Sequence, residues 1–208
     1  REQRERQQQA LQDLSIKWLQ FASRPENAVT EKWAFFLSDV YVVSQEKVNN
    51  TAHVHRHHDL IRQGCLGLAP ALTKAVSRSP AMVRYLDLQD SQKNAPNENF
   101  ARELFELFVL GEGNSTEQDI KEAARAFTGY RIRPDGFYFA ASQHDSRPKT
   151  VFGKTGDFTG DDVIDLAYQL PAAGRFVPHE MAKFYLSDEP LSPAYLATIG
   201  EWWQSTGY

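Results

Sequence analysis

Two short segments with helical periodicity, joined by a brief connection, constrain the fold of this chain most. The segments "NFARELFELFVL" and "EQDIKEAARAF" place apolar side chains at spacings of three and four, and only "GEGNST" separates them. Such spacings make one face of an α-helix apolar. Thr116 with Asp119, or Ser115 with Gln118, provides a capping box for the second helix. Because the link is so short, the two helices are predicted to lie side by side as a hairpin.

Other segments repeat this pattern and are separated by glycine and proline. Residues 11–21 carry leucine and aromatic side chains at helical spacing, and Thr30 can cap the apolar segment that follows it. Helices are also expected in "AMVRYLDL", "DDVIDLAYQL", "GRFVPHEMAKFYL" and "AYLATIGEWWQS". Within the third of these, Pro178 should kink or restart the helix.

One long stretch has no helical period. "GFYFAASQHDSRPKTVFGKTGDF" is rich in aromatic residues, glycine and turn formers, which predicts a short β-hairpin or extended loop around residues 135–155. The predicted fold is therefore mainly α, a single multi-helix domain. Residues 1–23 are expected to form a partly solvent-exposed N-terminal helix, and residues 24–208 the helical domain.

Composition excludes several classes of function. The chain has 208 residues, and its 41% hydrophobic content is enough to build a core. A net charge of -4, with basic and acidic residues interleaved, gives no basic surface for nucleic acid. No apolar run reaches the ~20 residues that a membrane-spanning helix needs. Cys65 is the single cysteine, so an internal disulfide is excluded. Because the sequence begins with Arg1, it is expected to be a fragment of a longer protein.

The helix that follows "APNE" is crowded with charges. At ~100° per residue, Glu98, Arg102 and Glu106 fall in one row, with Glu103 beside them. The interpretation favoured by this spacing is a solvated face with weak ion pairs. The alternative is that Glu103 and Glu106 offer carboxylates to a metal ion, as helix acids do in carboxylate-bridged sites, although no histidine follows either acid by three residues. The helical hairpin could also bring Glu103 or Glu106 near Arg125.

Two short motifs that contain histidine are further candidates. His144 and Asp145 lie together in the turn-rich stretch, where a histidine beside a carboxylate can act as a general base. Either residue could face the acid-rich helix across a shared cleft; alternatively, Asp145 caps the turn and His144 packs on the helical hairpin. In "HVHRHH", His53 and His57 would share a helical face and could chelate a metal, but an adventitious surface cluster is favoured.

The string from "PAMVRYLDLQD" to "EAARAFTGY", followed by "FYFAASQHDSRPKTVFG", closely resembles the bacterial domain of unknown function 1800 family. The matching motifs are "NENFAREL" at residues 97–104, "EAAR" at residues 122–125, and His144, Asp145 and Lys149. The resemblance extends from about Trp33 to Tyr208. Relatives in this family are usually longer at both ends. They commonly read phenylalanine-tryptophan-histidine-asparagine-histidine-phenylalanine where this chain has "FFLSDV" at residues 35–40, so both histidines are missing here.

This resemblance implies a bacterial protein, periplasmic or secreted, often encoded beside a sulfatase-like exported protein, with no settled activity. The function expected first is therefore a structural or protein-interaction domain. The alternative is a metal-dependent hydrolase-like enzyme that uses a divalent metal and is weakened if the missing histidines belonged to its site. Its candidate catalytic residues are Glu98, Arg102, Glu103, Glu106, Arg125, His144 and Asp145, of which Glu103, Glu106 and His144 would hold the metal.

Overall fold

The computed structural model describes residues 2–186, 189 and 191–208, and it confirms a mainly α fold. The α-helices of this part of the chain are α1 (Glu2–Ala22), α2 (Ala28–Val40), α3 (Gln45–Val48), α4 (Thr51–Gly64), α5 (Ala69–Ser77), α6 (Pro80–Tyr85), α7 (Asn99–Glu103), α8 (Glu117–Ala126), α9 (Gly160–Tyr168), α10 (Ala173–Tyr185) and α11 (Pro193–Ser205). Shorter helical segments are η1 (Leu88–Asp90), η2 (Leu104–Val109) and η3 (Ala141–Gln143). The strands are β1 (Tyr130–Arg133), β2 (Gly136–Phe139), β3 (Lys149–Val151) and β4 (Lys154–Gly156).

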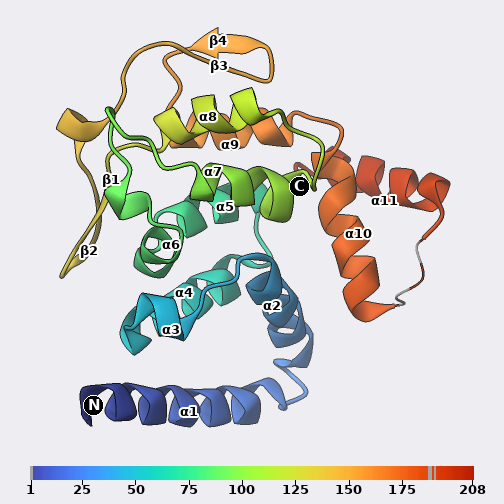
Figure 1. The fold of residues 1–208 in the computed structure, drawn as a ribbon. Helices are drawn as coiled ribbons and strands as arrows, with labels where there is room; N and C mark the ends of the chain where they lie inside the picture. The colour runs from blue at the N-terminus through green and yellow to red at the C-terminus, as the bar shows by residue number, and fades with distance from the viewer. Residues whose placement is uncertain (1, 187–188, 190) are drawn as a thin grey trace.

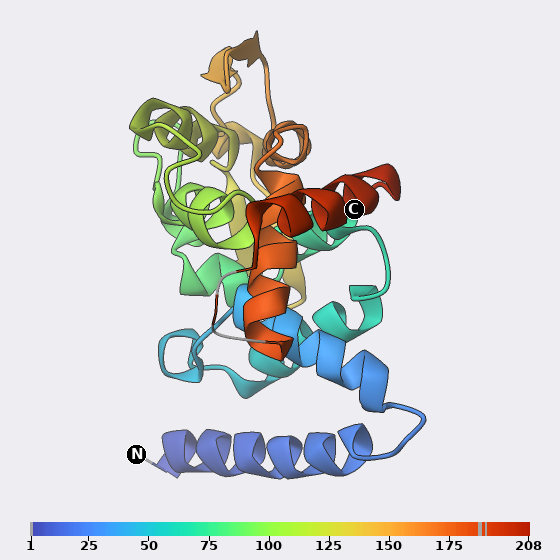
Figure 2. The same ribbon diagram turned by 90° about the vertical axis from the view of Figure 1, so that its right-hand side faces the viewer.

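The helices surround α7 and η2, which lie near the centre of the molecule (Figure 1). In both views α1 runs along one edge of the molecule, beyond α2 and α4, while the β3–β4 hairpin lies at the opposite end (Figures 1 and 2). The α10–α11 pair flanks the central helices on one side (Figure 1). None of the described helices is long and apolar enough to cross a membrane.

The predicted helical hairpin forms, but its first helix is only partly α-helical. After Glu103 the chain continues as a π-helix, in which the amide of Leu110 donates to the Phe105 carbonyl at 2.9 Å. The expectation of an α-helix throughout residues 100–110 is therefore wrong for η2. The buried residues of η2 come in two adjacent pairs, at positions 104–105 and 108–109, and the wider turn places both pairs in the core. The Thr116–Asp119 capping box of α8 is confirmed.

The turn-rich stretch contains two antiparallel hairpins. Strands β1 and β2 pair Tyr130 with Phe139, and β3 and β4 pair Lys149 with Gly156. The first hairpin begins before the range predicted from the sequence. Another boundary also differs: α2 begins at Ala28 after Asn27, so Thr30 lies inside its first turn and does not cap it.

Phenylalanines dominate the core. The rings of Phe100 and Phe127 lie 4.8 Å apart in an edge contact that joins α7 to α8. A chain of buried hydroxyl groups also crosses the core from α2 through α5 to α9. The Thr73 hydroxyl lies 2.7 Å from the Tyr41 hydroxyl and 2.9 Å from the Tyr168 hydroxyl. These bonds satisfy polar groups that would otherwise be costly to bury.

Helix α10 runs through Pro178 as one helix, so the restart expected from the sequence does not occur. A proline at this position cannot donate to the carbonyl of Gly174, four residues earlier. That carbonyl faces α11 at Gly200, where a Cβ atom would overlap it. The absence of a side chain at Gly200 therefore allows α11 to cross close over the carbonyl that Pro178 leaves without its helical partner.

We expect Gly200→Ala to destabilise the packing of α11 on α10 by about 1–3 kcal/mol, because the added methyl group forces two backbones apart. Urea unfolding followed by circular dichroism would measure the loss. Thr198→Ala, an exposed change in the same helix, is the control and should be close to neutral. Equal stability of Gly200→Ala and Thr198→Ala would show that the crossing tolerates a side chain.

Candidate functional site

Arg102 organises the polar face of the helical hairpin. Its guanidinium donates to both carboxylate oxygens of Glu117 on α8, at 2.7 and 2.9 Å, and lies 3.3 Å from Glu98 and 3.4 Å from Glu106. Glu117 was not among the sequence candidates, although it is the closest partner of Arg102. This bidentate ion pair joins α7 to α8, so the row of charges stabilises the packing of the two helices.

Arg125 does not lie with Glu103 or Glu106 as the sequence suggested. It pairs instead with Glu122 at 2.7 Å and with Asp145 at 2.8 Å. Glu117, at the beginning of α8, meets Arg102 of α7, whereas Arg125, near the end of α8, turns toward Asp145 in the turn-rich stretch.

Glu103 lies beside the row made by Arg102. Its partial burial raises the pKa of the Glu103 carboxyl, and the neighbouring Glu106 carboxylate raises this pKa further by a smaller amount. In the described part of the chain, no three histidine, cysteine, aspartate or glutamate side chains are arranged to hold a metal ion. The metal role of Glu103, Glu106 and His144 and the catalytic role of the seven candidates stay predictions.

Asp145 is the centre of a second polar cluster. Its carboxylate is 1% exposed and accepts hydrogen bonds from the Arg125 side chain at 2.8 Å and from the Arg147 side chain at 2.6 and 2.9 Å. It also accepts from the Arg147 amide at 3.0 Å, which confirms that Asp145 caps the turn. Hydrogen bonds from Arg147, and then from Arg125, hold the pKa of Asp145 well below its usual range.

The β3–β4 hairpin is attached to α8 through two acids. Glu122 accepts a hydrogen bond from the Thr150 amide at 2.9 Å, and Asp119 accepts one from the Phe152 amide at 2.7 Å. Lys149, which is fully buried, donates to the Arg147 carbonyl at 3.0 Å. Burial lowers the pKa of its ammonium group. The motif residues Glu122, Arg125, Asp145 and Lys149 therefore join the turn-rich stretch to the helical hairpin.

His144 and Asp145 use partners from different directions. The His144 Nδ1 atom lies 3.0 Å from the Thr128 carbonyl and must carry its proton to donate to it, which leaves Nε2 as the acceptor. Among the described residues, no hydrogen bond or ion pair joins the Asp145 cluster to the row around Arg102. The structure thus divides six of the seven sequence candidates between two separate networks, and the seventh, Glu103, takes part in neither through a hydrogen bond or ion pair with a described residue.

His53 and His57 of α4 do not lie on the surface. His57 is 1% exposed, with Nε2 donating to the Tyr41 carbonyl at 2.8 Å and Nδ1 facing the Ser79 hydroxyl at 3.0 Å. His53 is also buried. The surface location expected for this pair is wrong, because the apolar side of α4 that faces α2 and α6 includes both positions. With its ring nitrogens engaged, His57 is a core residue, and its burial lowers its pKa to about 4.

A groove lies between α1 and the helices α2 and α4, with a volume of about 660 Å³. Its apolar walls include Trp18, whose ring stacks on Phe35 at 5.6 Å, and Phe184, whose ring lies 5.9 Å from Phe35. Asp39 and His58 line its polar side. We call this cavity the α1 groove. Periodicity could not reveal it, because its walls come from segments far apart in the sequence.

The family profile described as "Protein of unknown function (DUF1800)" matches residues 1–208, which is the whole chain. The chain belongs to the DUF1800 family. No curated protein and no solved structure matches it significantly. Within this DUF1800 chain, the two positions at which the family resemblance leads us to expect histidines are Leu37, which is buried, and Asp39, which lines the α1 groove.

Proposed function

We propose that this DUF1800 domain is a protein-interaction domain of an exported bacterial protein, and that the α1 groove receives its partner. The observation that carries the proposal is the aromatic wall of the groove. Phe35 is 53% exposed and Val42 is 43% exposed, although both belong to an otherwise apolar helix region. Gathered apolar side chains that remain exposed mark sites of contact with other molecules.

The groove is held open by specific contacts and is not simply a loose edge. The Trp18 indole donates to the buried carboxylate of Glu31 at 2.8 Å, and the Thr51 hydroxyl donates to the Gln7 carbonyl at 3.0 Å. Arg62 lies 3.8 Å from Glu31 and 2.7 Å from Asp59. The Trp18 and Gln7 bonds fix α1 against the body of the domain, so the groove needs little reorganisation to bind.

The charges in the groove indicate what the partner carries. Glu31 and Asp59 are matched by Arg62, whereas Asp39 has no ion pair within the described residues. An amphipathic helix of the partner fits this pattern, with apolar side chains at helical spacing for the aromatic wall and a lysine or arginine for Asp39. The family resemblance names a sulfatase-like exported protein as the first partner to test.

Peptides selected from a phage-displayed library on the purified domain would test the proposal. We expect the selected peptides to carry apolar residues at helical spacing and a basic residue. Measured by fluorescence anisotropy, their binding should weaken about tenfold or more with Phe35→Glu or Val42→Glu, since each change places a charge in an apolar wall.

Leu107→Glu is the matched control, because Leu107 is 46% exposed but lies outside the groove. Asp39→Asn should weaken only the peptides that contain a basic residue. Peptides that bind equally well to the wild type and to both groove variants would contradict the proposal. Failure of the library to yield any binder that responds to these variants would do the same.

A further inference from the structure

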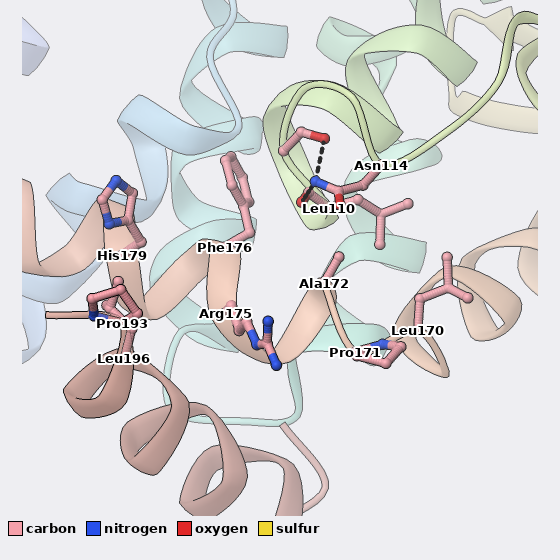
Figure 3. A pocket seen from close by; sticks show the side chains of 11 residues that line it. Leu110, Asn114, Leu170, Pro171, Ala172, Arg175, Phe176, His179, Pro193 and Leu196 are labelled. Carbon is pink, nitrogen blue, oxygen red and sulfur yellow. Dashed lines mark hydrogen bonds between the residues drawn. The ribbon is translucent and has the colours of Figure 1, made fainter. Parts of the chain in front are cut away.

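A second cavity, of about 590 Å³, lies between the end of η2, the first half of α10 and the beginning of α11. Figure 3 shows Leu110 and Asn114 on one side of α10, and Pro193 and Leu196 on the other. Its volume is in the range of sites that hold small organic molecules. The cavity shares no lining residue with the two polar networks described above or with the α1 groove.

The walls of this cavity are mostly apolar and fixed in place. The Phe176 ring packs against Gly111, where a Cβ atom would lie 2.8 Å from it and where φ is +82°. Only glycine meets both conditions without strain. The Asn114 side-chain amide donates to the carbonyls of Leu110 at 3.0 Å and Gly111 at 3.2 Å, so it holds the turn.

Two basic side chains, Arg175 and His179, line the cavity, and no carboxylate does so. Arg175 makes no ion pair with any described residue, unlike Arg102 and Arg125. The Nδ1 atom of His179 is shielded from solvent and has no hydrogen-bond partner within the described part of the chain. Arg175 and His179 are four residues apart on α10, and Figure 3 shows their side chains turned toward different parts of the cavity.

We propose that this cavity binds a small organic carboxylate with an apolar body. The guanidinium of Arg175 can hold a carboxylate through two parallel hydrogen bonds. The leucine, phenylalanine and proline side chains of the walls would cover the apolar part of the ligand. A highly charged phosphate compound fits less well, because one arginine and one histidine within apolar walls would leave much of its charge unmatched.

Isothermal titration with octanoate tests this assignment, with octanol and inorganic phosphate as separate probes. Octanoate should bind with a single site, octanol should bind at least tenfold more weakly, and inorganic phosphate should not compete. Arg175→Gln should weaken octanoate binding by tenfold or more, and His179→Gln should weaken it by a smaller factor. Arg175 is exposed, so this change leaves the fold intact, which a thermal melt of each variant would verify.

Lys183→Gln is the matched control, since Lys183 lies on the same helix but pairs with Glu180 outside the cavity. It should leave octanoate binding unchanged. Absence of octanoate binding would overturn the proposal, as would equal binding of octanol. Loss of binding in Lys183→Gln equal to that in Arg175→Gln would show only a general attraction of the anion to positive charge, and would also overturn it.

Discussion

Replacing Asp145 with alanine should lower the free energy of unfolding by about 3–5 kcal/mol, the largest loss expected for any single polar side chain here. The change removes a buried hydrogen-bond acceptor. It also leaves the Arg125 guanidinium, which is only 18% exposed, without its partner on the turn. It also removes the cap that accepts from the Arg147 amide. Urea unfolding at neutral pH, followed by circular dichroism, would measure the loss.

Because Asp145 is charged in the folded state, the free energy of unfolding should depend on pH in acid. Because its pKa is depressed in the folded state, this carboxyl contributes stability that is present above its unfolded pKa of ~4 and is lost as the pH falls below that value. Asp145→Asn should therefore flatten the dependence of stability on pH below pH ~4. Asp157→Ala, at an exposed carboxylate, is the control. A loss in Asp145→Ala no larger than in Asp157→Ala would contradict the central role of this residue.

Between pH ~6.5 and ~4, His57 should reduce the stability of the domain by up to about 3 kcal/mol. Burial lowers its pKa from 6.5 to about 4 in the folded state, whereas in the unfolded chain the imidazole takes up a proton near pH 6.5. The unfolded state thus binds more protons across this window, and stability falls as the pH falls. Below about pH 4 both states are protonated, and this contribution stops changing.

Urea unfolding midpoints at a series of pH values would measure the effect of His57. The comparison is between slopes, so the cost of removing the buried side chain does not enter. His57→Gln should have a shallower slope than the wild type between pH ~6.5 and ~4, whereas His55→Gln, at an exposed histidine, should keep the wild-type slope. Parallel curves for the wild type and His57→Gln would show that this imidazole is not the source of the acid sensitivity.

Local sequence signals predicted the helices well where the chemistry is local. The Thr116–Asp119 capping box and the short connection between α7 and α8 are decided by residues close in sequence, and both appear as expected. The π-helix was not predicted because the choice between α and π turns depends on how two pairs of adjacent apolar residues meet the core. The restart expected at Pro178 does not occur. Pro178 leaves the Gly174 carbonyl without its helical partner, and the close approach of α11 to that carbonyl depends on Gly200, which is distant in sequence.

The candidate site illustrates the same division. Periodicity placed Glu98, Arg102 and Glu106 in one row, and they do lie together. It could not predict that Glu117 completes this row or that Arg125 turns toward Asp145, because both contacts depend on how separate segments pack together. Arg175 was also missed, since its lack of an ion pair with any described residue becomes visible only in the folded structure.

The acids of α8 have a consequence for self-association. Strand β3 pairs with β4 on one side only, so the amides of Thr150 and Phe152 would otherwise form an open edge. Glu122 and Asp119 accept from these amides and occupy the positions that a strand from another molecule would need. Such open edges recruit strands from neighbouring chains. Helix α8 therefore protects the hairpin against aggregation by intermolecular β-pairing.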